Sequence, residues 1–235
     1  MAPAIEVVAL DADDTLWHSE VYFERTQRRF KELIGRYVDP DQVDIDAALV
    51  DVEHRNLPVY GYGIKGFTLS MVEAAIEITD GAIGVDELAQ ILASGRAMLD
   101  HPVDLLDGVD DTITELTAAG YRLILVTKGD LHHQEHKILA SGIGDRFERL
   151  EIVAEKDPET YGRVIASMGV EPAAFCMVGN SVRSDVLPVL ELGGHAVHIP
   201  YHVTWAHEHV EHDGTVPTLA SITELPAWLA GAATA

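Results

Sequence analysis

The sequence is poor in cysteine and in basic residues, and each shortage excludes a class of protein. Cys176 is the single cysteine among 235 residues, so no disulfide can form within the chain. Lysine and arginine together number 16 against 39 aspartate and glutamate residues, which gives a formal net charge of -23. Proteins that bind nucleic acid collect basic side chains to neutralise phosphates. We therefore expect no nucleic-acid partner.

Long apolar runs are also lacking. No stretch approaches the ~18 apolar residues that a membrane-spanning helix needs, and the N-terminus lacks the basic and apolar segments of a secretory signal. Cys176 lies in the apolar run AFCMVG, which favours a buried, reduced thiol. These features predict a cytoplasmic protein without a membrane partner. The acidic balance also means that a site for an anionic substrate needs a metal ion, lysines or backbone amides.

Short apolar runs alternate with helix-period segments in the second half of the chain. Counting one run at the N-terminus, strand-like runs occupy residues 5–10, 121–127, 149–155, 174–179 and 195–200. Helix-period segments occupy residues 109–119, 131–141, 158–168 and 184–192, and each is followed directly by a glycine, which commonly ends a helix. This alternation predicts an α/β fold in which parallel strands are joined by right-handed helical crossovers.

The segment between Trp17 and Leu105 breaks this rhythm. It contains no convincing strand, and its apolar residues recur at three- and four-residue spacing, as they do in amphipathic helices. Candidate helices cover residues 20–35, 41–56, 68–79 and 85–99. Residues 57–67, LPVYGYGIKGF, are interpreted as a connector rich in glycine and proline. We interpret the whole segment as an inserted helical domain.

The first strand-like run ends in two carboxylates, Asp11 and Asp13, with Thr15 close behind. Ligands of α/β proteins bind beyond the carboxyl ends of parallel strands, and residues two apart on a strand point to the same face. Two carboxylates at one point repel each other unless a cation joins them, and Mg²⁺ prefers such oxygen ligands. One carboxylate could then attack phosphorus while the other moves a proton. The alternative is a pair of solvated acids that cap a turn.

The ends of later strand-like runs carry side chains of complementary chemistry. Thr127 ends the second run and is followed by Lys128 and Gly129, so that a hydroxyl and backbone amides are available to an anion. Lys156 precedes a helix that begins with proline, where its ammonium could neutralise an acid and an incoming phosphate. Taken singly, a threonine or a lysine at such a place is more often an ordinary helix-start or surface residue.

The fourth run is followed by Asn180 and, five residues later, by Asp185, whose oxygens could complete a metal shell. In this order, the four elements resemble the signature motifs of the haloacid dehalogenase-like hydrolase superfamily. Its DxDxT motif reads DADDT here, Thr127 and Lys156 stand for the second and third motifs, and the fourth reads GNSVRSD. The resemblance implies a Rossmann-like three-layer core with a parallel sheet, residues 1–17 and 105–235, and an inserted α-helical cap domain, residues 18–104.

The resemblance also implies a function, namely hydrolysis of a phosphomonoester of a small metabolite through an aspartyl phosphate, with Mg²⁺ as cofactor. Asp11 would be the nucleophile, and Asp13 the general acid and base with its backbone carbonyl on the metal. Thr127 and Lys156 would hold the transferring phosphoryl oxygens, assisted by Lys128 and Gly129. The metal ligands would be Asp11, Asp13, Asn180 and Asp185.

Two residues depart from the family pattern. Asn180 stands where an aspartate is commoner, which keeps an oxygen ligand but removes one negative charge. Lys128 stands where many relatives carry asparagine or serine. Substrate choice is expected to lie in the cap and in the loop after residue 200, at Asn56, Tyr60, Tyr62, Lys65, Tyr201, His202 and Trp205.

Other readings stay open at this point. A haloacid dehalogenase would attack carbon without a metal, and Asp13 speaks against it because that branch typically has an aromatic residue there. A phosphomutase or a phosphonatase is a further alternative, the latter with Lys65 as its cap lysine, and so is a non-catalytic binding protein on this fold. The histidine-rich stretches at residues 132–136 and 207–212 are interpreted as solvated helix faces rather than zinc sites. The chain is expected to be a monomer or a homodimer.

Overall fold

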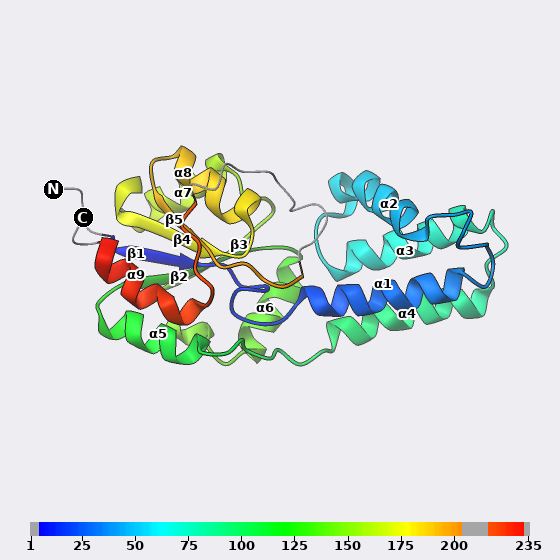
Figure 1. Ribbon diagram of the computed structural model, residues 1–235, viewed down its shortest axis with the longest axis horizontal. Coiled ribbons are helices and arrows are strands. Elements are labelled where there is room, and N and C mark those ends of the chain that lie inside the picture. Colours follow the sequence, from blue (N-terminus) through cyan, green and yellow to red (C-terminus); the bar gives the residue numbers. More distant parts are fainter. Residues whose placement is uncertain (1–4, 204–215, 233–235) are drawn as a thin grey trace. The chain divides into compact units, whose positions relative to one another are not determined.

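The computed structural model describes residues 5–203 and 216–232, which form two compact units (Figure 1). The core unit contains the first strand and most of the second half of the chain, and the helical unit contains the intervening helices. Their bounds are Met1–Glu20, Val103–Lys128 and Gln134–Ala235 for the core unit, and Val21–Pro102 and Gly129–His133 for the helical unit.

A parallel five-stranded sheet forms the centre of the core unit, with the strand order β3-β2-β1-β4-β5. The strands are β1 (Val7–Leu10), β2 (Arg122–Lys128), β3 (Arg149–Val153), β4 (Phe175–Gly179) and β5 (His195–His198). All four residues of β1 are buried, because a central parallel strand is covered on both faces. Leu10 pairs in register with Leu125 of β2 and with Val178 of β4. The residues that follow these positions therefore emerge together at one edge of the sheet.

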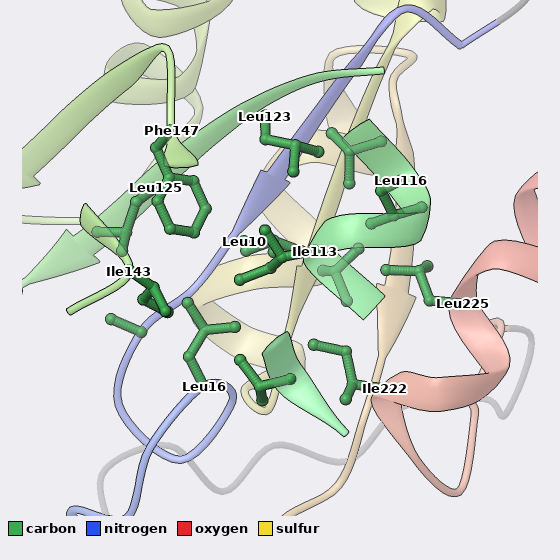
Figure 2. Packing of buried hydrophobic residues seen from close by; sticks show 14 of the residues in the cluster. Leu10, Leu16, Ile113, Leu116, Leu123, Leu125, Ile143, Phe147, Ile222 and Leu225 are labelled. Carbon is green, nitrogen blue, oxygen red and sulfur yellow. The ribbon is translucent and has the colours of Figure 1, made fainter. Parts of the chain in front are cut away.

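Helices cover both faces of this sheet. Alternate residues of β1 point to opposite faces, so Val8 and Leu10 join one apolar cluster while Val7 and Ala9 join another. The first cluster is completed by α5 (Val109–Ala118), α6 (Leu131–Ala140) and α9 (Leu225–Ala232), part of which is drawn in Figure 2. The second is completed by α7 (Pro158–Met168) and α8 (Leu187–Glu191). The predicted three-layer α/β core is confirmed.

The helical unit has an apolar cluster of its own. It consists of α1 (Glu20–Ile34, whose first residue belongs to the core unit), α2 (Ile45–Tyr60), α3 (Ile64–Ile78) and α4 (Val85–Leu99). Each helix buries one stripe, represented by Phe30, Leu49, Met71 and Ile91. Among the described residues, no helix is both long and apolar enough to cross a membrane.

Three local expectations differ from the structure. The connector predicted at 57–67 shrinks to three residues, because α2 continues through Pro58 and the turn is made by Gly61 and Gly63, with φ values of 71° and 107°. The helix predicted at 184–192 is divided into a π-helical turn, Val182–Val186, and α8. Proline in the first turn of α8 donates no backbone hydrogen bond, which favours this break. Helix α9 was not predicted.

Gly95 of α4 generates a stability prediction, because it packs directly on Thr68 of α3. A Cβ on Gly95 would lie 2.2 Å from Thr68 Oγ1 and 2.8 Å from Thr68 Cγ2. The hydroxyl cannot rotate away freely, since it donates a 2.7 Å hydrogen bond to the carbonyl of Ile64. We expect Gly95→Ala to lower the free energy of unfolding by about 1–3 kcal/mol, measured by urea denaturation, although alanine favours helix.

Two further variants check the cause of that loss. A Cβ added to Gly162 of α7 would have no neighbouring atom within 4 Å, so Gly162→Ala should be neutral or stabilising by up to about 1 kcal/mol. In a Thr68→Ala background most of the cost of Gly95→Ala should disappear, because the clashing atoms are gone. An undiminished cost in that background would show that the contact is not its source.

Candidate active site

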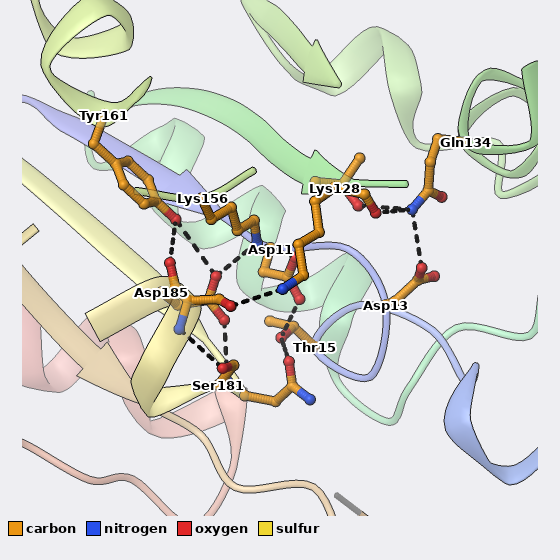
Figure 3. A network of polar contacts seen from close by, with 12 residues as sticks. Asp11, Asp13, Thr15, Lys128, Gln134, Lys156, Tyr161, Ser181 and Asp185 are labelled. Atoms are coloured by element: carbon orange, nitrogen blue, oxygen red, sulfur yellow. Dashed lines mark hydrogen bonds and ion pairs between the residues drawn. The ribbon is translucent and has the colours of Figure 1, made fainter. Parts of the chain in front are cut away.

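A buried ion cluster lies at the carboxyl edge of the sheet, where β1 and β4 end (Figure 3). Asp11 directly follows β1, and Lys156 lies in the loop between β3 and α7. The Lys156 ammonium contacts Asp11 Oδ1 at 2.5 Å and Asp185 Oδ1 at 2.6 Å. Exposure is only 6% for Asp11, 5% for Lys156 and 1% for Asp185. Three segments that are far apart in sequence thus meet in one charged cluster away from water.

The electrostatics of this cluster follow from its burial. For Lys156, desolvation lowers the pKa of the ammonium, but the two carboxylates outweigh it and the pKa is raised overall. For Asp11, desolvation raises the pKa of the carboxyl to about 7, with Lys156 opposing the rise and Asp185 adding to it. Two carboxylates against one ammonium leave the cluster with an excess of negative charge.

The place of Asp185 depends on the turn after β4. The backbone N–H of Ser181 donates to Asp185 Oδ2 at 3.0 Å, and Asp185 lies in the π-helical turn. The carboxylate packs on the backbone of Gly179, where a Cβ would lie 2.1 Å from Asp185 Oδ2. Glycine is therefore required at the end of β4 if the carboxylate is to reach Lys156. The hydroxyl of Tyr161 lies 3.5 Å from the other oxygen, Asp185 Oδ1.

Thr15 and Asn180 border the cluster on the side of Asp11. Thr15 Oγ1 lies 3.2 Å from Asp11 Oδ2 and 3.5 Å from Asn180 Oδ1, and its single hydrogen can be donated to one of them at a time. The structure thus brings the amide oxygen of Asn180 to the same hydroxyl as the Asp11 carboxylate. Asp11 and Asp185 contribute carboxylate oxygens to this region, and Asn180 contributes its amide oxygen.

Asp13 belongs to a second ion pair, separate from the first. Lys137 Nζ lies 2.6 Å from each carboxylate oxygen of Asp13, Trp17 Nε1 donates to Oδ1 at 2.7 Å, and Gln134 Nε2 donates to Oδ2 at 3.0 Å. Burial alone would raise the pKa of Asp13, but the charge of Lys137 and the hydrogen bonds from Lys137, Gln134 and Trp17 lower it overall. Each of the two acids of the first motif therefore has its own lysine.

Thr127 and Lys128, the last two residues of β2, make contacts with different neighbours. Thr127 is buried, and its Oγ1 lies 3.0 Å from Gln134 Nε2, beside Asp13. Lys128 Nζ donates to Ser184 Oγ at 2.9 Å, next in sequence to Asp185. Gly129 has a φ of 145°, which favours glycine, and is counted in the helical unit. Thr127 and Lys128, neighbours in sequence, thus contact different segments, namely Gln134 of α6 and Ser184 of the π-helical turn.

The donor chemistry of the first cluster fits Mg²⁺. Mg²⁺ takes oxygen ligands and usually binds through one or two carboxylates, with water and substrate phosphate completing its shell. Asp11 and Asp185 provide carboxylates, Asn180 provides an amide oxygen, and the excess negative charge favours a cation. Within residues 5–203 and 216–232, no group of three or more His, Cys, Asp or Glu side chains is arranged as a metal site. Two carboxylates and one amide oxygen suit a metal that shares its shell with water and substrate.

The expected specificity residues have different surroundings. In the core unit, the Tyr201 hydroxyl lies 2.6 Å from His18 Nδ1, and the rings of Tyr201 and His202 have centroids 4.2 Å apart. Trp205 lies outside the described residues. In the helical unit, Asn56 is buried and donates to Ser70 Oγ at 3.2 Å.

The other expected residues of the helical unit lie nearer its surface. Lys65 forms an ion pair with Asp130 at 2.9 Å. Tyr60 is exposed at the end of α2, and Tyr62 is half-buried. Asn56 is thus part of the interior of the helical unit, whereas these three side chains have at least part of their surface in solvent.

Sequence reasoning missed Gln134 and Lys137, which contact Asp13. In the segment LHHQEHKI the histidines drew attention, yet His132 and His136 are exposed while Gln134 and Ile138 are buried. A helical pattern of 134, 137 and 138 on one face was the available signal. No zinc cluster is found among the described residues, and residues 207–212 lie outside them.

Comparisons with known proteins agree on one family. A family model described as haloacid dehalogenase-like hydrolase matches residues 5–193. N-acylneuraminate-9-phosphatase of Mus musculus is 26% identical over 96% of this chain and 94% of its own. Glyceraldehyde 3-phosphate phosphatase of Methanothermobacter thermautotrophicus is 29% identical over 48% of this chain and 54% of its own. The crystal structure of a haloacid dehalogenase-like family hydrolase from Xanthomonas campestris has a TM-score of 0.85 and 41% identity, covering 98% of this chain and 94% of its own.

The buried ion cluster predicts a large and pH-dependent effect of Lys156→Met on stability. Without the ammonium, Asp11 and Asp185 remain buried and unpaired, so we expect a loss of about 3–5 kcal/mol in the free energy of unfolding near neutral pH. Without Lys156, which lowers it, the pKa of the Asp11 carboxyl would rise above its wild-type value of about 7. The folded variant then binds more protons than the folded wild type above about pH 7, so its stability deficit should be largest at alkaline pH and shrink as the pH falls toward about 7.

Lys128→Met is the matched control, because the Lys128 ammonium donates to the Ser184 hydroxyl and lies 3.8 Å from the exposed carboxylate of Glu155. Its expected cost is about 1 kcal/mol. Urea denaturation of both variants across a pH series provides the measurement. Equal, pH-independent losses would contradict the assigned role of Lys156 in the cluster.

Proposed function

The chain belongs to the haloacid dehalogenase-like hydrolase family, and from that premise we propose that it hydrolyses phosphate monoesters of small metabolites through an aspartyl phosphate on Asp11. The observation that carries the proposal is the placement of Asp11 at the end of the central strand, in contact with Lys156 and two residues before the separately held Asp13. A nucleophile, a cation for phosphoryl oxygens and a proton carrier are the parts that such a reaction needs.

The named relatives support a phosphate ester as substrate. The mouse protein is an N-acylneuraminate-9-phosphatase and aligns over almost its whole length, and the archaeal protein is a glyceraldehyde 3-phosphate phosphatase. Both names describe release of phosphate from a small phosphorylated compound. A phosphate ester is an anion, and a chain with a net charge of -23 repels it unless Lys156 and a cation offset the repulsion at the site.

In the first half of the proposed reaction, a carboxylate oxygen of Asp11 forms a bond to phosphorus. The bond between phosphorus and the ester oxygen breaks, and the leaving oxygen takes a proton from Asp13. Lys156 and the hydroxyl of Thr127 offset charge on the phosphoryl oxygens as the group moves. The organic product leaves as an alcohol, and the phosphoryl group remains on Asp11.

In the second half, water attacks phosphorus and Asp13 accepts its proton. The bond between phosphorus and Asp11 breaks, which releases inorganic phosphate and restores the free carboxylate. The proton that Asp13 accepts here replaces the one that it gave to the leaving oxygen, so the proton count closes over the cycle. Asp11, Asn180 and Asp185, with the Asp13 backbone carbonyl, would hold Mg²⁺. When bound, Mg²⁺ supplies positive charge that stabilises the transferring phosphoryl group.

The dehalogenase alternative is disfavoured by the second ion pair. A halide leaves carbon without needing a proton, whereas an alkoxide that leaves phosphorus does need one. Asp13, with Lys137 Nζ 2.6 Å from each of its carboxylate oxygens and hydrogen bonds from Gln134 and Trp17, is placed to donate the proton that the alkoxide needs and the halide does not. The phosphonatase alternative requires a free cap lysine, and Lys65 is paired with Asp130.

Replacing the nucleophile tests the proposal most directly. Asp11→Asn should lower kcat by about 10³-fold or more, because the amide forms no aspartyl phosphate. Phosphate release would be followed with N-acylneuraminate 9-phosphate, glyceraldehyde 3-phosphate and p-nitrophenyl phosphate. Asp111→Asn, at an exposed position in the first turn of α5, should keep the wild-type rate. Near-normal turnover by Asp11→Asn would overturn the assignment.

Metal removal tests the cofactor separately. Protein treated with EDTA and then freed of the chelator should have little phosphatase activity, and added Mg²⁺ should restore it, because the excess negative charge of the site would otherwise repel the substrate. The same preparations would be assayed for halide release from 2-chloropropionate. Full phosphatase activity without a metal would contradict the cofactor, and metal-independent halide release would support the dehalogenase alternative.

A further inference from the structure

We propose that Gln134 and Lys137 are positioning residues that set the Asp13 carboxylate and the Thr127 hydroxyl relative to each other. The inference rests on the proposed function, since it assigns to these residues a part in its proton-transfer step. Both lie on α6, three residues apart and hence on the same face of the helix. Neither belongs to the motifs that identify the family from sequence.

The amide of Gln134 joins the two catalytic segments. Its side chain is 2% exposed, and Nε2 lies 3.0 Å from Asp13 Oδ2, 3.0 Å from Thr127 Oγ1 and 2.7 Å from the carbonyl oxygen of Lys128. Two amide hydrogens thus face three acceptor oxygens that come from the first motif and from the end of β2. Because Thr127 accepts from the amide, its own hydroxyl hydrogen is available to a phosphoryl oxygen.

Lys137 holds the same carboxylate by both oxygens. Nζ lies 2.6 Å from Asp13 Oδ1 and 2.6 Å from Oδ2, and the Lys137 side chain is 11% exposed. Two equal contacts restrict rotation of the carboxylate about its Cβ–Cγ bond. The neighbouring residue Ile138 anchors this face of α6 in the apolar cluster of the core unit. The orientation of Asp13 is therefore determined by a helix that is itself fixed to the core.

The oxygen atom of the Gln134 amide indicates that the contribution of Gln134 to stability does not alone account for its presence here. Gln134 Oε1 is buried and has no hydrogen-bond partner among the described residues. Such an orphan acceptor costs about 1–3 kcal/mol. Turning the amide over would place Oε1 against the oxygens of Asp13 and Lys128, which carry no hydrogen to donate, and would use the Thr127 hydroxyl hydrogen for the amide. In the observed orientation Oε1 has no donor among the described residues, and Nε2 donates to Asp13 and Thr127.

The chemical consequence concerns the leaving group. An ester of p-nitrophenol departs readily without a proton, whereas an alkyl phosphate depends on proton donation from Asp13. Misplacing Asp13 should therefore damage alkyl ester cleavage far more than aryl ester cleavage. A helix that served only to support the fold would affect both substrates alike. The ratio of kcat/KM for glycerol 2-phosphate to that for p-nitrophenyl phosphate separates the two cases, because kcat/KM reports the steps up to formation of the aspartyl phosphate.

Three single variants provide the first test. Lys137→Met and Gln134→Leu should each lower kcat/KM for glycerol 2-phosphate by about 30- to 100-fold, while p-nitrophenyl phosphate loses less than about fivefold. Lys137→Arg, which keeps a charged donor, should recover most of the loss. His136→Gln, on the exposed face of the same helix, is the matched control and should retain wild-type values for both substrates. Equal losses on the two esters, or none, would overturn the inference.

A double-mutant cycle provides the second test. If Lys137 acts through Asp13, then Lys137→Met should have almost no further effect in an Asp13→Asn background. Additive losses would overturn the inference, because they would show that Lys137 acts elsewhere. Circular dichroism and urea denaturation identify any variant that has failed to fold, and the less disruptive Lys137→Arg then decides.

The two levels of the proposal fail in different ways. If the wild-type protein with Mg²⁺ released phosphate from none of the esters, or if Asp11→Asn were active, the proposed function would fall and the positioning role with it. If the wild type were active and Asp11→Asn inactive, but Lys137→Met retained the wild-type ratio of kcat/KM for the two esters, the positioning role alone would fall.

Discussion

The rest of the site depends on one buried ammonium. Lys156 lies between Asp11 and Asp185, and these three residues come from the end of β1, the loop before α7 and the turn after β4. Removing three charges from water costs several kcal/mol per ion, and mutual pairing offsets that cost only when the geometry is good. Gly179 and the Ser181 N–H secure the geometry by letting Asp185 pack on the backbone. The edge of the sheet can therefore hold these three charged groups away from water.

The strands could be predicted from sequence, because a strand that is buried on both faces is a continuous run of apolar residues. VVAL of β1 and FCMVG of β4 are continuous apolar runs, and the polar residues that follow them stand out for that reason. Asp11, Thr127, Lys156 and Asp185 were all proposed from their positions at or after the ends of strand-like runs. Parallel strands bring their carboxyl ends to one edge of the sheet, so the sequence pattern was enough to propose most residues of the candidate site.

The sequence did not predict which charged side chains pair with each other. Asp11 and Asp13 are two residues apart and were expected to converge on one cation, yet each has a different lysine. Lys137 lies 124 residues beyond Asp13, in a helix whose histidines were more conspicuous than its inward face. Asn56 was assigned to substrate choice from its place in the inserted helical segment, and its amide is buried within the helical unit and donates to Ser70. Partners of this kind depend on tertiary packing, which residue type and spacing do not encode.

The separation of the two ion pairs has a consequence for how one site can perform two tasks. A nucleophile and a proton carrier that shared one lysine would each alter the charge felt by the other during a turnover, since coupled groups titrate as a pair. With Lys156 on Asp11 and Lys137 on Asp13, each acid has its own compensating charge. The chain is strongly acidic overall, and it places two of its few lysines against carboxylates that are only two residues apart. In the proposed reaction, bond formation at Asp11 can then proceed without altering the charge partner of Asp13, which remains set by α6.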